Sequence, residues 1–441
     1  MPGDKSISHR WLLMAAIANG RSILRGVPRS LDTSSTATCL SLLAPSARPV
    51  LEAWASSPSV PDERHGSTWN RDVTNLNLGT LDLRAEGRAS LRSPGRELDC
   101  GNSGTTMRLV AGLVSPCPFE TVLVGDSSLS ARPMDRVARP LREMGAEVAT
   151  DEGHPPLTIR GSKLRGIRFE PDVPSAQVKG AVLFAALAGE GKTTVAERVS
   201  TRDHTERLFR AVAAPIRSDG GDIVLEGPFQ HEGFHGSIPG DPSSAAFLLG
   251  AAALTGGHIT IMGVGLNPTR LHHLEVLGRM GVEVEIEVER EELGEPVGSM
   301  RLPPIGSLRS VEVGASELPL VIDEVPLIAA LAAHAEGPSR FEGAGELRVK
   351  ESDRLSVLAE GVRGLGGEAV EEGDDLVLGG GGLAGGSTPF LSDHRLAMAF
   401  VVTALAGRGP SEIDGIESAA VSFPGFVGLL RSLGADVEVS R

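Results

Sequence analysis

The stretch that decides the fold is LREMGAEV at residues 141–148, because its pattern returns three times further along the chain. LGRMGVEV lies at 277–284, GLGGEA at 364–369 and LRSLGADV at 430–437. Each copy is typical of the last turn of an amphipathic helix, a glycine that ends it, and a strand of alternating polarity. Successive glycines lie 136, 85 and 68 residues apart. Because 136 is twice 68, a unit of roughly seventy residues is expected to recur, which predicts several copies of one α/β unit.

Length and composition indicate two domains with sizeable cores. The chain has 441 residues, of which 41% are hydrophobic, so two domains of about two hundred residues each are expected. Four stretches are apolar all round and are expected to be helices buried inside a ring of sheets. They lie at 176–187, 243–254, 326–335 and 395–406. The stretch 45–96 has little periodicity and is predicted to be a long irregular insertion.

Charge and cysteine content exclude several functions. The net charge of −15 argues against nucleic acid or an anionic membrane as a partner. The sequence shows neither an apolar run of transmembrane length nor a signal peptide, so a soluble cytoplasmic protein is expected. Cys39, Cys100 and Cys117 have neither the number of a disulfide framework nor the spacing of metal ligands. Because the chain as a whole is acidic, an anionic ligand would need a local cluster of Lys and Arg.

The N-terminal stretch PGDKSISHR at residues 2–10 has the composition of a phosphate site at the start of a helix. Asp4 or Ser6 can cap that helix, and the free N–H groups of its first turn attract anions. Lys5 and Arg10 add full positive charges. An ordinary capped helix with solvated charges explains the same residues, so this stretch alone leaves both interpretations open.

Seven further polar turns lie where helices are expected to begin. Each places a cation or an acid at the mouth of an apolar helix, where a ligand can be held. A solvated face or a local ion network could explain any one of them, but seven together favour a binding site. They are GNSGTTMR (101–108), GDSSLSARPM (125–134), PSAQVK (174–179), TRDHTER (201–207), IDEVP (322–326), VKESDR (349–354) and SDHR (392–395).

The stretch GEGKTT at 189–194 looks like the end of a nucleotide-binding P-loop but does not fit that motif. The motif needs a glycine where Ala186 stands, and it needs a helix after the glycines. Here the predicted helix comes before them and a β-type run follows. No P-loop is therefore expected.

The whole series of motifs resembles the signatures of the 5-enolpyruvylshikimate-3-phosphate synthases, a family of enolpyruvyl transferases. PGDKSISHR, GNSGTTMR, GDSSLSARPMDR, SAQVK, RDHTER, IDEVP, RVKESDR and SDHRLAM occur in the family's order and cover the chain apart from the insertion. The resemblance implies an inside-out α/β barrel in which each of two domains has three βαβαββ units, with helices inside and sheets outside. The domains are expected at 1–237, which binds substrate, and 238–441, with a hinge near 1–4 and 238–241.

The resemblance also implies an activity. The enolpyruvyl group of phosphoenolpyruvate is transferred to the 5-hydroxyl of shikimate 3-phosphate and phosphate is released, with no metal or organic cofactor. The vinyl carbon must be protonated while the hydroxyl is deprotonated, which gives a tetrahedral ketal that then loses phosphate. The expected partners are these two small molecules, with neither nucleic acid nor membrane, and a monomer is expected.

Matching the motifs position by position assigns the site residues that the resemblance implies. For shikimate 3-phosphate they are Lys5, Ser6, Arg10, Ser175, Ala176, Gln177, Thr201 and Lys350, and Asp323 is expected to bind substrate as well. For phosphoenolpyruvate they are Lys5, Asn102, Gly104, Arg132, Gln177, Arg354 and Arg395. The catalytic set is Lys5, Asp323 and Glu351, in which the two carboxylates would move protons.

The chain departs from the family pattern at three places. It starts at the PGDKS motif, so the strand that usually precedes this motif is expected to be missing. Val421 stands where many members have a lysine that contacts phosphoenolpyruvate. Ala176 and Thr201 occupy positions where serines often bind phosphate, and Ala176 offers only its backbone.

Two alternatives stay open at this point. The related transferase that adds enolpyruvate to UDP-N-acetylglucosamine shares the fold, but its loop has a reactive cysteine where this chain has Ser127. A relative without catalysis could bind an anionic metabolite. The presence of both Asp323 and Glu351 argues against that, because binding of anions alone would not need two acids.

Overall fold

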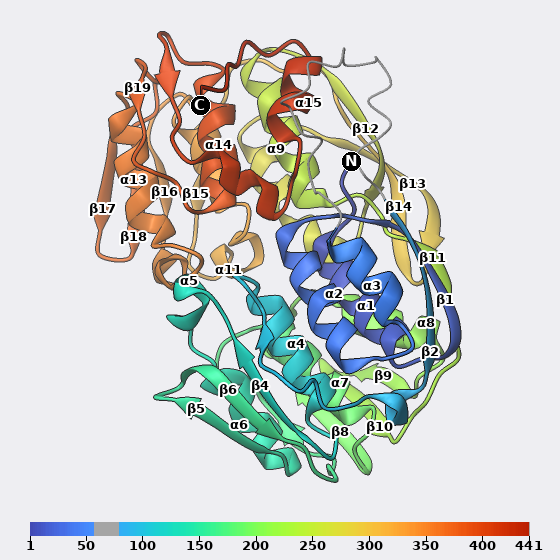
Figure 1. The fold of residues 1–441 in the computed structure, drawn as a ribbon. Helices are drawn as coiled ribbons and strands as arrows, with labels where there is room; N and C mark the ends of the chain where they lie inside the picture. The colour runs from blue at the N-terminus through green and yellow to red at the C-terminus, as the bar shows by residue number, and fades with distance from the viewer. Residues whose placement is uncertain (57–78, 441) are drawn as a thin grey trace.

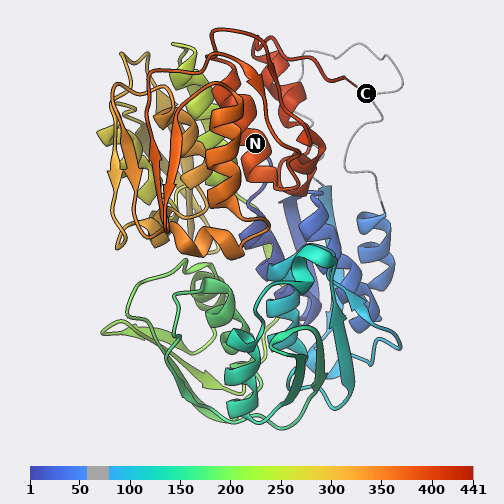
Figure 2. The ribbon, with the colours of Figure 1, turned by 90° about the vertical axis from the view of Figure 1, so that its left-hand side faces the viewer.

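The computed structural model describes residues 1–56 and 79–440, which form two lobes (Figures 1 and 2). The buried apolar side chains fall into two clusters, one running from Ile7 to Ile238 and the other from Ala245 to Leu430. The first cluster lies in the blue-to-green lobe and the second in the yellow-to-red lobe. Within the described ranges, no helix combines the length and apolar character needed to cross a bilayer.

Three segments repeat one strand–helix–strand–helix–strand–strand order. In each, the first two strands pair in parallel, the remaining pairs are antiparallel, and the fourth strand lies between the second and the third. The first comprises β3 (Leu98–Asp99), α4 (Gly104–Val114), β4 (Glu120–Val124), α6 (Asp135–Met144), β5 (Glu147–Asp151) and β6 (His154–Arg160), with a short α5 (Ser127–Ser130) after β4. The second comprises β7 (Arg168–Phe169), α7 (Ala176–Ala186), β8 (Gly191–Ala196), α8 (His204–Ala211), β9 (Ile216–Asp219) and β10 (Asp222–Gly227). The third comprises β15 (Glu312–Val313), α12 (Val325–Ala332), β16 (Ser339–Phe341), α13 (Arg354–Gly364), β17 (Ala369–Glu372) and β18 (Asp375–Leu378).

The remaining elements form three smaller sheets and their helices. The sheet β11-β1-β2 joins β11 (His235–Ser237), β1 (Asn19–Val27) and β2 (Gly79–Glu86), and its helices are α1 (Lys5–Ala16), α2 (Leu31–Leu43) and α3 (Arg48–Ala55). The sheet β12-β14-β13 joins β12 (Ile259–Gly265), β14 (Glu295–Leu302) and β13 (Glu285–Glu292), with α9 (Pro242–Leu254) and α10 (His272–Arg279). The pair β19 (Gly386–Ser387) and β20 (Ser411–Glu412) flanks α14 (His394–Ala404), with α15 (Phe426–Ser432) following. Short helical turns are η1 (Arg88–Ser90), η2 (Pro268–Arg270), α11 (Leu318–Val321), η3 (Ala344–Val349) and η4 (Ile416–Val421).

The four glycines of the repeat all end helices in the left-handed region. Gly145, Gly281, Gly366 and Gly434 have φ of 117°, 92°, 76° and 101°, values that a side chain disfavours. A strand follows the first three, as predicted. The strand predicted after Gly434 is not formed, because residues 435–440 pair with no strand among the described parts of the chain.

The prediction of an irregular insertion at 45–96 is wrong for its described part. The helix α3 occupies its beginning, and β2 pairs antiparallel with β1 near its end. In β2, buried Leu81, Leu83 and Ala85 alternate with exposed residues, which is the pattern of a strand with one face on the core. Residues 57–78 of the predicted insertion lie outside the described residues.

The four apolar helices are confirmed as α7, α9, α12 and α14, and they are buried. Figure 1 shows α1, α2, α4 and α7 side by side within one lobe, with strands around them. The helices α4 and α7 pack so closely that a Cβ at Gly112 would lie 2.1 Å from the Ala181 carbonyl oxygen. A helix precedes the GEGKTT turn and β8 follows it, so the rejection of a P-loop is confirmed.

The two lobes are joined where two segments pair. Gly3 and Gly240 form an antiparallel bridge. The Asp4 N–H donates to the Pro239 carbonyl (2.7 Å), and the Asp241 N–H donates to the Pro2 carbonyl (2.9 Å). The helix α1 begins directly after one segment and α9 directly after the other, so this pairing sets the start of a buried helix in each lobe.

Candidate active site

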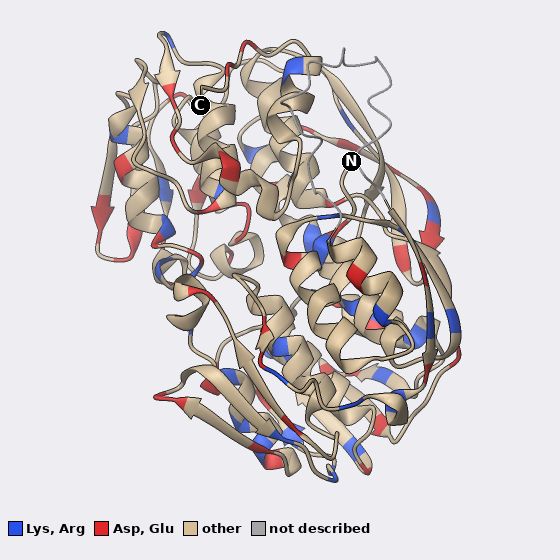
Figure 3. Ribbon diagram, viewed as in Figure 1, with Lys and Arg blue, Asp and Glu red and all other residues tan. Residues whose placement is uncertain are grey.

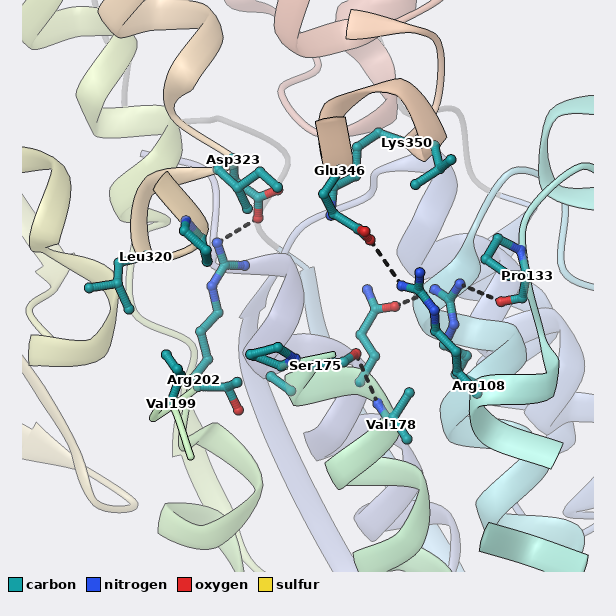
Figure 4. Close-up of a pocket in the computed structure, with 18 of the residues that line it drawn as sticks. Arg108, Pro133, Ser175, Val178, Val199, Arg202, Leu320, Asp323, Glu346 and Lys350 are labelled. Atoms are coloured by element: carbon teal, nitrogen blue, oxygen red, sulfur yellow. Dashed lines mark hydrogen bonds and ion pairs between the residues drawn. The ribbon is translucent and has the colours of Figure 1, made fainter. Parts of the chain in front are cut away.

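A cavity of about 220 Å³ lies between the lobes (Figure 4). Its walls combine cations from the first lobe with carboxylates from the second. Acidic and basic residues are otherwise spread over both lobes (Figure 3), so the cavity is a local arrangement within a net acidic chain. The charged and polar lining residues are Arg108, Arg132, Arg136, Ser175, Gln177, Ser200, Thr201, Arg202, Thr269, Asp323, Glu346, Lys350 and Glu351.

The N-terminal stretch begins a helix whose cap is Asp4, with its carboxylate accepting from the Ile7 N–H at 2.9 Å. The Lys5 ammonium pairs with Asp32 at 2.8 Å. Arg10 is buried; its Nε donates to the Thr205 hydroxyl at 2.7 Å and its Nη2 to the Ala176 carbonyl at 3.3 Å. Burial lowers the pKa of Arg10 to about 10. Neither Lys5 nor Arg10 is among the residues that line the cavity.

Asp323 is surrounded by cations. Its Oδ2 lies 2.5 Å from Arg202 Nη2 and 3.6 Å from Arg395 Nη2, and its Oδ1 lies 3.8 Å from Arg354 Nη1. Burial alone would raise the pKa of Asp323, but Arg395, Arg202 and Lys350 hold this pKa well below its usual range. Asp323 is therefore a carboxylate at neutral pH.

Glu351 occupies a second cationic environment. Its Oε2 lies 2.6 Å from Arg354 Nη2, and its Oε1 lies 3.7 Å from Arg132 Nη1. Burial opposes ionisation, yet the charges of Arg354 and Arg132 hold the pKa of Glu351 well below its usual value. The pKa of the neighbouring His394 is lowered by burial and then by Lys5, so this imidazole stays neutral. The site thus holds two ionised carboxylates and a neutral histidine.

Arg132 is oriented by groups from two loops of its own lobe. Its Nη2 donates to Asn102 Oδ1 at 2.7 Å and reaches the Ser128 hydroxyl at 3.4 Å. Gly104 leaves room beside it, because a Cβ there would lie 2.8 Å from Arg108 Nη1 and 3.3 Å from Arg132 Nη1. Because Gly104 has no side chain, the guanidinium groups of Arg108 and Arg132 can lie beside each other.

The start of α7 forms the other part of the cavity. The Ser175 hydroxyl caps this helix by accepting from the Val178 N–H at 3.3 Å. The Gln177 amide accepts from Arg108 at 2.5 Å and donates to the Thr105 hydroxyl at 2.8 Å. The Thr201 hydroxyl donates to Glu197 at 2.5 Å, so this hydroxyl already has an acceptor.

Further contacts cross the cavity between the lobes. Arg136 Nη1 lies 2.9 Å from Glu346 Oε1, and the Ser128 hydroxyl donates to the Glu351 carbonyl at 2.9 Å. With the Arg202–Asp323 and Arg132–Glu351 pairs, these contacts match cations of one lobe with carboxylates of the other.

The structure places some of the predicted residues on the cavity wall and others away from it. Arg132, Ser175, Ala176, Gln177, Thr201, Asp323, Lys350 and Glu351 line the cavity. Asn102, Gly104, Arg354 and Arg395 stand behind these residues, in contact with or beside Arg132 or Asp323, and Lys5, Ser6 and Arg10 lie at the start of α1. Val421 lies at the end of η4 and brings no charge.

Sequence reasoning missed Arg108, Arg136, Arg202 and Glu346 as lining residues. The three arginines lie within the motifs at 101–108, 125–136 and 201–207, so their signal was present in the sequence. Glu346 precedes the RVKESDR motif and had no such signal. Among the residues described, no three His, Cys, Asp or Glu side chains are grouped to hold a metal ion, and the three cysteines are buried and free.

Comparisons with known proteins agree along nearly the whole chain. The family model for EPSP synthase (3-phosphoshikimate 1-carboxyvinyltransferase) matches residues 1–59 and 73–430. A curated protein from Halorhodospira halophila named 3-phosphoshikimate 1-carboxyvinyltransferase is 43% identical, covering 100% of this chain and 94% of that protein. One from Acidithiobacillus ferrooxidans with the same name is 40% identical, covering 100% and 96%.

A solved structure adds agreement in three dimensions. The EPSP synthase from Acinetobacter baumannii superposes with a TM-score of 0.81 and 37% identity, covering 100% of this chain and 96% of that chain. The mixed α/β fold is therefore shared. These comparisons support the first activity expected above over the UDP-N-acetylglucosamine transferase. The chain belongs to the EPSP synthase (3-phosphoshikimate 1-carboxyvinyltransferase) family.

Proposed function

We propose that the chain transfers the enolpyruvyl group of phosphoenolpyruvate to the 5-hydroxyl of shikimate 3-phosphate, a step of the shikimate pathway to chorismate and the aromatic amino acids. The observation that carries this proposal is the meeting of Arg132, Arg354 and Arg395 with the carboxylates of Asp323 and Glu351 at one cavity. Arginines bind carboxylate and phosphate groups, and a pair of carboxylates can act as base and acid.

Shikimate 3-phosphate is assigned to the wall formed by the first lobe. Its phosphate fits the start of α7, where Ser175 and the free N–H groups of the first turn face the cavity. Gln177 and Lys350 lie on the same cavity and can bond its hydroxyls. Arg10 supports this wall by fixing the Ala176 carbonyl. The Thr201 hydroxyl can contribute once it leaves Glu197.

Phosphoenolpyruvate is assigned to the arginines that come from both lobes. Arg132, oriented by Asn102 beside Gly104, belongs to the first lobe, and Arg354 and Arg395 belong to the second. Lys5 lies at the start of α1 and supplies a charge shared by the two anionic substrates. Both lobes must therefore be in place for this substrate to be held.

The acids can change their protonation as the substrates bind. Asp323 and Glu351 are ionised because the positive charges of nearby arginines stabilise the carboxylate form. Substrate phosphates and carboxylates compete for those arginines and bring negative charge nearby, which raises the pKa of a carboxylate. One acid can then take the hydroxyl proton while the other delivers a proton to the vinyl carbon. The resulting ketal then loses phosphate together with a proton from the methyl group formed in the first step, which restores the vinyl double bond, and the arginines stabilise the charge of the departing phosphate.

We also propose the finer organisation of the fold. The domains span 1–237 and 238–441, with a hinge at 1–4 and 238–241, and each is one half of an inside-out α/β barrel. The division of the buried apolar residues into two clusters supports this assignment. A monomer fits a cavity built from residues of a single chain, and we propose that this monomer is cytoplasmic, as expected from the sequence.

The test is a phosphate-release assay on the purified full chain with both substrates, with the product identified by mass. Release is expected only when both substrates are present. Lys5→Met is expected to reduce kcat by at least about a hundredfold, because charge stabilisation at the reacting groups is lost. Near-normal turnover in this variant would contradict the role of the N-terminal stretch. Turnover with UDP-N-acetylglucosamine would favour the related transferase that acts on that substrate. Binding of both substrates without turnover would favour a relative that binds anionic metabolites without catalysis.

A further inference from the structure

We infer that Arg270 is a positioning residue, which fixes both segments that join the lobes and thereby fixes the position of Lys5 in one lobe relative to Asp323 in the other. Arg270 ends the turn η2 and is 4% exposed. It does not line the cavity, so any effect on the reaction acts through other residues. The inference rests on the proposed function, because Lys5 and Asp323 have roles only in that reaction.

One guanidinium holds the caps of two helices. Arg270 Nη1 pairs with the Asp4 carboxylate, and its Nη2 pairs with Asp241 Oδ1 at 3.0 Å. Asp4 caps α1 and Asp241 caps α9. These two acids directly follow the glycines of the Gly3–Gly240 bridge. Arg270 therefore ties the first helix of each lobe to the same point.

The contacts of Arg270 also lead towards the proposed reacting groups in both lobes. Asp4 is the neighbour of Lys5 in sequence. Arg270 Nη2 also donates to the Ser243 hydroxyl at 2.8 Å, and that hydroxyl donates to Glu324, the neighbour of Asp323. Glu324 Oε1 in turn lies 3.8 Å from Arg395 Nη1. A shift of the Arg270 side chain would thus displace Lys5 relative to Asp323 and Arg395.

A second buried contact between the lobes lies beside Arg270. His204 Nδ1 is 2.8 Å from Glu295 Oε1, and its Nε2 is 3.5 Å from Arg270 Nη1. Asn267 donates to Asp203 at 2.7 Å and to Glu295 at 2.9 Å. The joint between the lobes is therefore polar, and its charged groups face partners of opposite charge, so it defines one orientation more strictly than apolar packing would.

The geometry requires arginine rather than a positive charge alone. The planar fork presents donors in two directions, so it can satisfy Asp4 and Asp241 together, whereas an ammonium is a point charge. Burial by itself disfavours the cation, but Asp4 and Asp241 hold the pKa of Arg270 above its usual range. Arg270 therefore stays charged wherever the enzyme is active.

The experiment compares Arg270→Ala and Arg270→Lys with wild type and with Arg301→Lys in the full chain. Arg301 pairs with Glu285 on the exposed face of the same lobe, at 2.7 Å, and serves as the matched control. The measurements are kcat, the KM of each substrate, the Kd of shikimate 3-phosphate by calorimetry, and the Tm. Arg270→Ala is also assayed with added guanidinium at millimolar concentration, below denaturing levels.

We expect Arg270→Ala to lose about a hundredfold in kcat, the loss typical of reacting groups displaced by about 1 Å. The Kd of shikimate 3-phosphate should stay within threefold of wild type, because its phosphate is assigned to the start of α7 in the first lobe and Lys350 of the second lobe is assigned only to its hydroxyls. Added guanidinium should restore kcat at least about fivefold, and Arg270→Lys should not restore it, because the fork is what is needed.

Folded variants with kcat within about twofold of wild type would overturn the inference. So would a loss of kcat, Kd and Tm together without rescue, because that pattern is general structural damage. If Arg270→Ala does not fold, Arg270→Lys is used instead. A loss of kcat with an unchanged Kd of shikimate 3-phosphate in that variant supports the inference, and an unchanged kcat overturns it. A wild-type chain without turnover would instead refute the proposed function and is seen before any variant is made.

Discussion

The Arg202 guanidinium and the Asp323 carboxylate meet across the cavity, with 2.5 Å between Nη2 and Oδ2. They come from different lobes and are 121 positions apart in the chain. The same relationship holds between Arg136 and Glu346. The carboxylates of one lobe thus pair with arginines of the other, and an anionic substrate must compete with these carboxylates.

The first prediction concerns Asp323→Asn. This change removes a proton-transfer group, so kcat should fall by about 10²- to 10⁴-fold. It also frees Arg202 and Arg395 from a competing carboxylate, so the Kd of phosphoenolpyruvate, the substrate assigned to Arg395, should not rise. Steady-state kinetics and calorimetry measure the two quantities. Asp82→Asn is the control, because Asp82 pairs with Arg21 at the surface. A kcat within tenfold of wild type would show that Asp323 does not move the proton.

The second prediction is an order of binding. Phosphoenolpyruvate should bind weakly to the free enzyme and more tightly once shikimate 3-phosphate is present. Arg132 lies in one lobe while Arg354 and Arg395 lie in the other, and all three already have carboxylate partners. Binding of shikimate 3-phosphate frees some of these arginines from their carboxylate partners and favours closure of the two lobes. Calorimetry that gives equal affinities with and without shikimate 3-phosphate would contradict this order.

The third prediction concerns Gly104→Ala. The added Cβ would lie 2.8 Å from Arg108 Nη1 and 3.3 Å from Arg132 Nη1, so these groups must move. The KM for phosphoenolpyruvate should rise about tenfold, equivalent to about 1.4 kcal/mol, and more than the KM for shikimate 3-phosphate. Gly278→Ala is the control, since a Cβ at this helical glycine meets nothing within 4 Å. Equal changes in the two KM values would rule out a local effect on Arg132.

The fourth prediction concerns stability and pH. His9 is buried and its Nδ1 is 2.7 Å from the Thr36 hydroxyl. Burial, opposed by Asp32 and reinforced by Lys5, lowers the pKa of His9 to about 4 from 6.5. Because the folded pKa is the lower one, the unfolded chain takes up a proton first as the pH falls through 6.5. The free energy of unfolding should therefore decrease between pH 6.5 and pH 4.

The size of this effect can be measured with His9→Asn, which keeps a polar group beside Thr36. Between pH 7 and pH 5 the wild type should lose about 2 kcal/mol of unfolding free energy that the variant does not lose. Urea unfolding at several pH values measures the difference. Parallel pH profiles of the two proteins would mean that His9 is not held neutral by the fold.

Local patterns in the sequence determined the helices and the repeat. The apolar runs that became α7, α9, α12 and α14 bury all their faces, so their composition alone identifies them. The glycines that end helices were readable because only a residue without a side chain adopts positive φ at low cost. The alternation in β2 was also present, but it stood inside a stretch of low periodicity and was missed.

The order of the motifs along the chain was enough to predict the family and the reaction. Each motif places its polar groups at the start of a helix, a local property that sequence fixes. Arg132, Ser175, Asp323 and Glu351 could be predicted for this reason, as could the cap formed by Asp4.

The tertiary structure alone decided which of these groups face one another. The Arg202–Asp323 pair and the Arg270–Asp4 pair join residues 121 and 266 positions apart. No periodicity carries that information, because such contacts depend on how two separately packed cores meet at the paired segments near Gly3 and Gly240. The ionised state of Asp323 and Glu351 follows from the same meeting, since a carboxylate keeps its charge in a buried site only when cations from other elements surround it.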